Sequence, residues 1–303
     1  MNESVRYTHL TLGEVAERMT KRGVAVTRYF VVALFDAFKL TRRKAAKTGT
    51  YKQVEGRDEQ FENIARLKAE YVQPGDLILS VDSKKKEQLG CFQRPGQLYG
   101  EQAQQVFTHD FASYADPEQK TKVAPFGIYD VVRNLGYVFL NQSADTADYA
   151  ATCLFEYFKH YATKLPQKVK RVLLLCDSGG SNGARLHRFK ELLQWISDRF
   201  GIYIRVAHYP SYCSKYNPCD HRLFPHVTRS MGGGVLDSMQ TMRDLIKRRA
   251  TTRKGLLVRV RCLKRDFQRG VKASKEFLEN PTTIFEPLLP KWNYSFKPRI
   301  VNT

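Results

Sequence analysis

Three short, almost uninterrupted apolar segments constrain the fold of this 303-residue chain more than any other feature. They are DLILSVDS (76–83), RVLLLCDS (171–178) and IYIRVAHYP (202–210). Each has the length of one β-strand, and a strand that is apolar on both faces must be covered on both faces. The segments therefore predict the central strands of a sheet that is flanked by helices.

The stretches between these segments predict the remaining elements of the same domain. FGIYDVVRNLGYVFLNQS (126–143) indicates two strands joined by a turn at Asn134-Leu135-Gly136. A helix is expected over 145–165, capped by Asp145 or Thr146, and another over 184–200, closed by Gly201. The order strand, hairpin, helix, strand, helix, strand, helix predicts a mixed α/β sheet over residues 51–303. Residues at about 90–124 are irregular and are interpreted as an insertion in this domain.

The first 50 residues have a different pattern. Apolar residues at helical spacing predict one helix that ends near Gly23, and Thr27 is placed to cap a second helix, RYFVVALFDAFKL. Two helices joined by a short turn are typical of a helix-turn-helix, whose second helix can enter the major groove of DNA. The basic segment TRRKAAK (41–47) then leads into a linker. We therefore predict a DNA-binding segment over residues 1–50, with contacts from Arg28, Arg42 and Arg43.

The charge of the chain indicates its class of partner. Fifty Lys and Arg against 30 Asp and Glu give a formal net charge of +20, which favours a polyanion, with nucleic acid first. A membrane partner is not expected, because no apolar run approaches the roughly 20 residues that span a bilayer. No signal-peptide pattern follows Met1, and the six Cys contain no CxxC pair, so reduced thiols and a cytoplasmic location are expected.

Three acidic residues are placed where an α/β sheet gathers its functional side chains. Asp82 and Asp177 end the first two apolar strands, and sites of open α/β sheets lie outside the carboxyl ends of such strands. Asp220 follows the third strand, at the start of a predicted helix, where an acid is often only a cap. Three converging carboxylates suit Mg²⁺, and two such ions can catalyse phosphodiester displacement. Other acids, Asp110, Asp130, Asp145, Asp148 and Asp237, compete, and structural roles suit those at the hairpin and helix starts better.

The segment YPSYCSKYNPCDHRLF (209–224) resembles the third-acid segment of DDE transposases, in which an Asn-Pro pair precedes the acid. SVDSKKKEQLG, FGIYDVVRN, CDSGGSNGARL, SKYNPCDHRLF and WNYSFKP together resemble the ISAzo13-type, or Rhodopirellula-type, bacterial transposases, in order over about residues 10–298. This resemblance implies a ribonuclease-H-like catalytic domain. It also implies that Asp82, Asp177 and Asp220 hold two Mg²⁺ or Mn²⁺ ions.

The same resemblance implies the substrate, and at two points this sequence departs from the family pattern. Double-stranded DNA, as transposon ends and target, would be bound by a dimer or larger homo-oligomer. The third acid is Asp where the pattern has Glu, one methylene longer, so its helix must lie closer or a water must bridge to the metal. Only one helix-turn-helix unit precedes the linker, whereas family members carry more DNA-binding sequence upstream, which leaves recognition of transposon ends open.

Basic residues near the acids are predicted to contact DNA. Lys84, Lys85 and Lys86 directly follow the first acid, and Lys215, His221 and Arg222 surround the third. The loop GGSNG (179–183) is expected to make a tight turn that exposes Asp177, with Asn182 as a helix cap and Arg185 beside it. The segment 243–265 holds ten Lys and Arg and is interpreted as a track for the DNA backbone. Its predicted contacts are Arg248, Arg249, Arg253 and Lys254.

The Cys and His residues around Asp220 fit no common zinc module, so zinc is not expected. Three functions stay open at this point. The first is a DDE transposase that cuts transposon ends and joins the 3′-OH to target DNA. The second is a catalytically weak or inactive DNA-binding descendant that regulates transposition. The third is a metal-dependent nuclease without strand transfer.

Overall fold

The structure of the protein is a computed structural model that describes residues 8–43, 54–107 and 121–299. The chain forms two compact units, Met1–Lys52 and Gln53–Thr303. The linker boundary expected near residue 50, and Asp110 in the insertion, lie outside the described residues.

The N-terminal unit contains two helices, α1 (Leu12–Lys21) and α2 (Arg28–Ala37). Thr11 caps α1 in a capping box with Glu14, and the Thr27 hydroxyl accepts a hydrogen bond from Phe30 N at 3.3 Å. The prediction that Thr27 caps the second helix is therefore confirmed. Arg28, Arg42 and Arg43 are all exposed in this unit.

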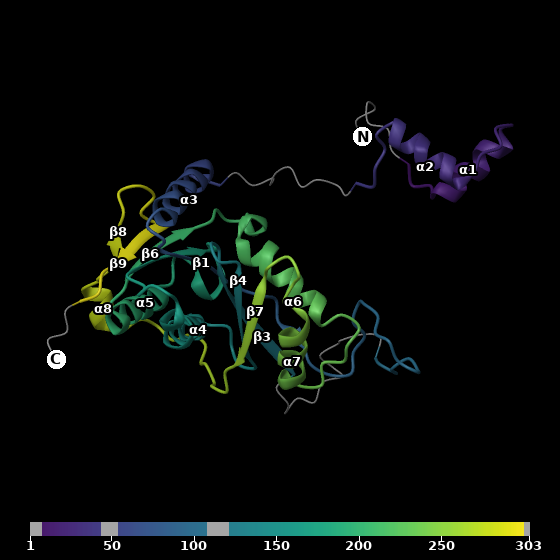
Figure 1. Cartoon of the computed structure of the whole chain (residues 1–303). Helices are drawn as coiled ribbons and strands as arrows, with labels where there is room; N and C mark the ends of the chain where they lie inside the picture. Colours follow the sequence, from purple (N-terminus) through teal and green to yellow (C-terminus); the bar gives the residue numbers. More distant parts are fainter. Residues whose placement is uncertain (1–7, 44–53, 108–120, 300–303) are drawn as a thin grey trace. The chain divides into compact units, whose positions relative to one another are not determined.

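The second unit is built on one sheet, whose strands are coloured from blue to yellow along the chain in Figure 1. The spatial order is β7-β4-β3-β1-β5-β6-β9-β8, and the short β2 pairs with β3. The bounds are β1 (Leu77–Ser83), β2 (Glu87–Gln88), β3 (Lys122–Asp130), β4 (Leu135–Asn141), β5 (Arg171–Cys176), β6 (Tyr203–His208), β7 (Leu257–Cys262), β8 (Ile284–Phe285) and β9 (Asn293–Phe296).

The strand directions identify the fold class. On one side of β1, β3 pairs with it antiparallel and β4 pairs antiparallel with β3, while β5 and β6 follow parallel to β1 on the other side. An antiparallel three-strand half joined to a parallel half through the first strand is the ribonuclease-H-like sheet, as the resemblance implied. The strand β7 extends this core beside β4, and β9 and β8 extend it beside β6.

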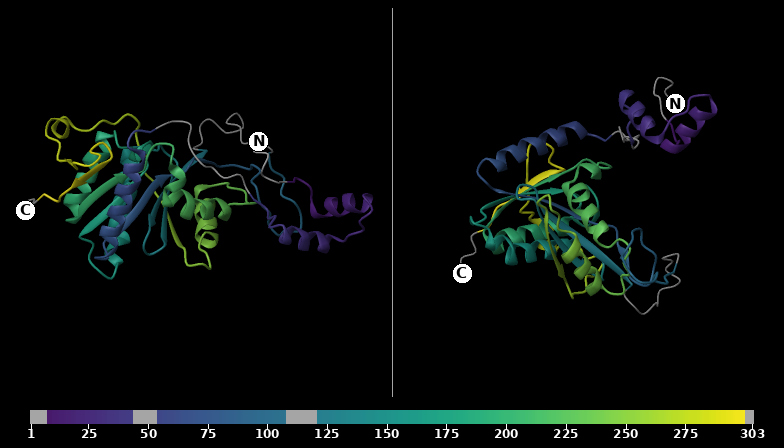
Figure 2. Two further views of the ribbon diagram at one scale, coloured as in Figure 1. Left: turned by 90° about the horizontal axis from the view of Figure 1, so that it is seen from above. Right: turned by 45° about the vertical axis from the view of Figure 1, so that its right-hand side comes forward.

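Helices cover both faces of the sheet. Side chains of α4 (Ala147–His160) and α5 (His187–Phe200) pack on the face that carries Leu79, Val81 and Leu174. The opposite face is covered by α3 (Arg57–Val72), α6 (Phe224–Ser230) and α7 (Met239–Arg249). The right-hand view of Figure 2 shows α3 and the pair α4–α5 on opposite sides of the strands. A short helix, α8 (Lys275–Glu279), precedes β8, and no described helix is long and apolar enough to cross a membrane.

Two of the local expectations for this unit are confirmed and one is wrong. Thr146 caps α4, and Gly201, with φ 63°, closes α5 in the left-handed conformation that glycine adopts without steric cost. Asn182 does not cap a helix, because α5 begins only at His187. Its buried side-chain amide instead donates to the Val81 carbonyl oxygen at 3.1 Å, which fixes the GGSNG loop to the end of β1.

Candidate active site

The first two predicted acids lie side by side. Strands β1 and β5 are parallel, with Val81 opposite Cys176, so the next residues, Asp82 and Asp177, leave neighbouring strands at the same level. Val81 and Cys176 point into the core beneath α4 and α5. Because side chains alternate along a strand, Asp82 and Asp177 both point to the opposite face.

Burial and neighbouring negative charges perturb both carboxyl groups. Desolvation, followed by the negative charges of Asp177 and Asp220, raises the pKa of Asp82 from its ordinary 3.8 to about 8. Burial also raises the pKa of Asp177, and a hydrogen bond from Asn217 partly offsets this effect. Carboxylates that are held close together despite their mutual repulsion are a common feature of metal-binding and catalytic sites.

Asn217 connects the third-acid segment to both strand ends. Its side chain is fully buried and donates from Nδ2 to Asp177 Oδ1 at 2.8 Å. Its Oδ1 accepts from the Ser80 hydroxyl and from Cys219 N at 3.2 Å. In the sequence, Asn217 stands out only as part of the Asn-Pro pair that precedes the third acid. The structure shows that it also orients the carboxylate of Asp177.

His208 supports Asp177 from the other side. Its ring is buried, with Nδ1 2.8 Å from the Asp177 carbonyl oxygen and Nε2 2.9 Å from the Tyr294 hydroxyl. Burial lowers its pKa to about 4, so the imidazole is neutral near pH 7. His208 therefore holds the backbone at the end of β5 and adds no positive charge to the acids.

Asp220 lies within a helical turn and does not cap it. The turn Cys219–Leu223 is π-helical, its N-terminal flanking residue is Pro218, and it has no side-chain cap. Pro225, at the start of α6, has no N–H to continue an α-helical bond pattern back to His221, which favours the wider turn here. Single π-helical turns are frequent at functional sites.

Two glycines allow this turn to pack directly on the sheet. A Cβ at Gly127, which pairs with Asp82, would lie 2.6 Å from Phe224 Cε1, and a Cβ at Gly136 would overlap Leu223 Cδ1. Cys219 N donates to the Ser80 hydroxyl at 3.1 Å, which binds the same turn to β1. The third-acid helix therefore lies closer to the strands than it could over residues with side chains.

The donor set suits a hard divalent cation, with carboxylate oxygens from three elements and no sulfur or imidazole ligand. Within this set of ligands, Asp82 and Asp177 are held in place by adjacent strands, and the negative charge of Asp177 acts on Asp82. Among the described residues, no group of three or more His, Cys, Asp or Glu side chains is arranged to hold a metal ion. Asp220 thus lies near enough to raise the pKa of Asp82 but would have to approach further to share a metal ion with the pair.

The competing acids in the described residues have structural partners. Asp130 is fully buried, accepts from the backbone N–H groups of Val132 and Arg133, and pairs with the Arg133 guanidinium at 3.2 Å. Asp148 pairs with Arg188 at 2.7 Å. Asp145 accepts a 3.0 Å hydrogen bond from Ser83, next to Asp82, and its charge contributes weakly to the raised pKa of Asp82.

The lysines after Asp82 have different surroundings. Lys84 is paired with Glu87, which also binds Arg94 at 3.0 Å, and Lys86 donates to the Ser143 carbonyl oxygen at 3.3 Å. Lys85 is exposed. Of the three, only Lys85 is fully turned to solvent, while the other two are partly buried beside the end of β1.

Most of the other predicted DNA contacts are exposed on the second unit. They are Arg185, Lys215, His221, Arg222, Arg248, Arg249, Arg253 and Lys254. The basic segment 243–265 does not form one continuous face. Its helix α7 packs on the face of the acids, whereas Arg261 on β7 pairs at 3.2 Å with Glu156 of α4, on the opposite face. The α7 part is therefore the half of the segment that shares a face with the acids.

The family model described as the Rhodopirellula transposase DDE domain matches residues 1–298. Among solved structures, the Mos1 transposase paired-end complex with left transposon end is 15% identical, with a TM-score of 0.44, over 82% of this chain and 73% of that one. The mariner Mos1 paired end complex with Mg is 14% identical over the same shares, with a TM-score of 0.45. The Mos1 Strand Transfer Complex is 12% identical, with a TM-score of 0.45, over 84% of this chain and 75% of that one. No curated protein matches the sequence.

Proposed function

The chain belongs to the family of Rhodopirellula-type transposases with a DDE domain, and on this premise we propose that it is the DNA transposase of an insertion sequence. The proposed reaction is metal-dependent cleavage at transposon ends, followed by transfer of the freed 3′-OH into target DNA. The protein would act on double-stranded DNA of the bacterial chromosome, as a dimer or larger assembly that bridges two ends.

One observation carries the proposal, namely the pair of largely buried carboxyl groups at the ends of two adjacent parallel strands. A protein that only binds DNA gains nothing from buried acids on the face that meets the DNA, because they repel the phosphate backbone and cost folding free energy. A metal-dependent phosphoryl-transfer enzyme requires them.

Each residue of the site has a proposed role. Asp82 and Asp177 would hold Mg²⁺ or Mn²⁺, with Asp220 completing the ligand set for two ions. Such ions, when bound, polarise the scissile phosphate and activate the attacking oxygen. Asn217 would orient Asp177 and oppose the rise of its pKa, since its amide donates to the carboxylate. Lys85 and the exposed cations of α7 would neutralise DNA phosphates.

Because the third acid is Asp where the family pattern has Glu, a non-catalytic regulator is the second candidate function. A nuclease differs from a transposase in a further way, since it cuts DNA without joining it to another molecule. The test incubates the full chain with supercoiled plasmid and a labelled oligonucleotide in Mg²⁺ or Mn²⁺. Nicked plasmid and oligonucleotide joined to plasmid are both expected. Asp82→Asn and Asp177→Asn should abolish both products, while Asp237→Asn, at an exposed acid, should not. DNA binding without either product would favour the regulator, and nicks without joining would favour the nuclease.

A further inference from the structure

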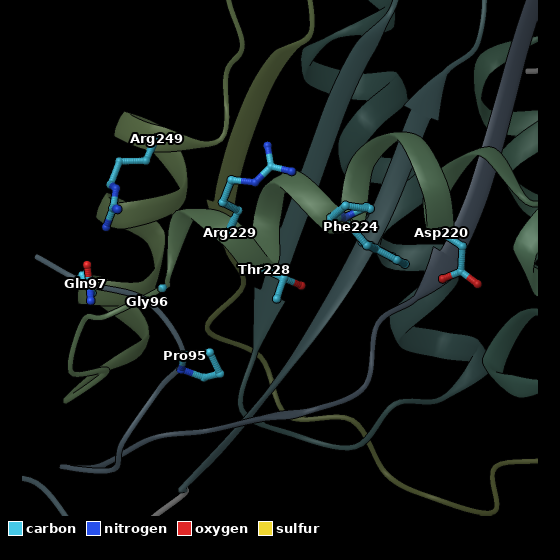
Figure 3. A pocket seen from close by; sticks show the side chains of 10 residues that line it. Pro95, Gly96, Gln97, Asp220, Phe224, Thr228, Arg229 and Arg249 are labelled. Carbon is cyan, nitrogen blue, oxygen red and sulfur yellow. The ribbon is translucent and has the colours of Figure 1, made fainter. Parts of the chain in front are cut away.

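A groove leads away from the third acid. It has a volume of about 690 Å³, within the roughly 300–1,000 Å³ of ligand-binding clefts. Asp220 lies at one end, and Phe224 and Thr228 follow at intervals of four residues along the helix (Figure 3). Arg249 of α7 lies at the other end, opposite Gln97, and Arg229 lies between Arg249 and Phe224. The groove therefore begins at a proposed catalytic acid and ends among cations.

The second wall of the groove comes from the insertion, at Pro95-Gly96-Gln97. This segment crosses the turn after α6 at a contact of backbone on backbone. Gly233 N donates to the Pro95 carbonyl oxygen at 3.1 Å, and a Cβ at Gly96 would lie 2.7 Å from Gly233 N and 2.8 Å from Gly232 C. A second backbone bond, from Gly90 N to the Leu236 carbonyl oxygen at 2.7 Å, fixes the start of the insertion. The wall is thus held in place by the fold.

The lining of the groove suits a polyanion. Arg229 and Arg249 are exposed, and within residues 54–107 and 121–299 neither forms an ion pair with an acid. Among the described residues of the lining, Asp220, at the catalytic end, is the one acid. Thr228, partway along the groove, and Gln97, opposite Arg249, add hydrogen-bonding groups to the lining.

We infer that this groove binds a single DNA strand next to the scissile phosphate, with Arg229 and Arg249 on its phosphates and the insertion as its outer wall. The inference rests on the proposed function, because it assigns a strand path to the same site. A strand that enters beside Asp220 would place successive phosphates along α6 toward α7. The insertion would then serve to separate this strand from its complement at the point of cleavage.

The test measures binding without divalent metal, so that no cleavage takes place. The probes are a fluorescein-labelled strand of about 20 nucleotides and the matching duplex, each long enough to cover a site of this kind. Arg229→Ala combined with Arg249→Ala should weaken single-strand binding by about tenfold. It should also lower the salt dependence of log K by about 1.4, at about 0.7 for each lost phosphate contact. Arg199→Ala combined with Arg269→Ala, at exposed arginines outside the groove, is the matched control and should change neither value.

Crosslinking locates the strand independently of affinity. A photoreactive p-benzoylphenylalanine in place of Thr228 should crosslink to the labelled strand, whereas the same residue in place of Trp195, exposed on α5, should not. The inference is overturned if the double variant matches its control, if strand and duplex binding weaken equally, or if Thr228 crosslinks only to a second copy of the chain. Plasmid joining by the unmodified protein is scored separately. If the unmodified protein does not join plasmid, the proposed function is contradicted. If it does join plasmid but the double variant binds the single strand as tightly as wild type, the groove alone is contradicted.

Discussion

Replacing Asp82 by Asn should stabilise the metal-free protein. The Asp82 carboxyl is largely buried beside Asp177 and Asp220, and these surroundings raise its pKa to about 8. The unfolded chain has no such surroundings, so folding at neutral pH requires Asp82 to take up a proton that the unfolded state has released. An asparagine amide has nearly the same shape and carries no charge, so the variant avoids this cost.

The size of the effect follows from the two pKa values. The folded state holds the proton up to about pH 8 and the unfolded state only up to about pH 3.8, so wild-type stability is lost as pH rises through this interval. Each pH unit in the interval contributes about 1.4 kcal/mol. The variant should therefore gain up to about 2 kcal/mol at pH 5 and up to about 4 kcal/mol at pH 7, relative to wild type.

The assay is urea denaturation in EDTA at the two pH values, comparing free energies of unfolding. Asp130→Asn is the matched control, because Asp130 is also buried but is paired with Arg133, so its replacement should destabilise by a few kcal/mol. Added Mg²⁺ should stabilise wild type, through binding to the folded state alone, and should stabilise Asp82→Asn much less. A variant that is less stable than wild type at pH 7, or a gain that does not grow with pH, would refute the reasoning.

Three further changes test other parts of the site. Gly127→Ala should cost about 1–3 kcal/mol by overpacking against Phe224, and it should weaken Mn²⁺ binding measured by calorimetry, because the third-acid turn must move outward. Asn217→Ala should cost about 2–3 kcal/mol, since it leaves buried polar groups unpaired, and it should shift Mn²⁺ binding to higher pH, since the hydrogen bond that lowers the pKa of Asp177 is lost. His208 has a folded pKa of about 4 against 6.5 in the unfolded chain, so it contributes stability that is present above pH 6.5 and lost as pH falls to 4. His208→Gln should abolish that part of acid denaturation, and an unchanged acid limb would show that another group is responsible.

Much of the catalytic unit could be predicted from the sequence because its strands are apolar on both faces. Such strands can only be central, and their order with the intervening helices leaves few topologies. The convergence of Asp82 and Asp177 follows from the same reasoning, since parallel neighbours end at one edge of the sheet. The hairpin turn was also predictable, and Asn134 adopts a positive φ of 55° there, as Asn tolerates better than most residues.

The contacts that complete the site could not be predicted, because they join residues far apart in sequence. Nothing in the sequence around Asn217 shows that its side chain would reach Ser80 and Asp177. The wall of the groove depends on Gly96 meeting Gly232 and Gly233, which lie in segments without periodic patterns. The signal that was present is the glycine run MGGG (231–234), since adjacent glycines mark a place where another backbone can approach closely.

Gly127 and Gly136, which lie beneath the turn that carries Asp220, help to explain how the site can use Asp where the family pattern has Glu. An Asp reaches about one methylene less far than a Glu, so a metal shared with Asp82 and Asp177 requires a closer backbone or a bridging water. Gly127 and Gly136 remove two side chains from the surface on which Leu223 and Phe224 rest, and Cys219 N bonds directly to Ser80 of β1. These contacts bring the turn toward the strands, in the direction that the shorter acid requires. If the closer backbone is the compensation, Asp220→Glu should lower activity below that of wild type, although less than Asp220→Asn does. Its longer side chain would have to fit in the space that the glycines have already closed.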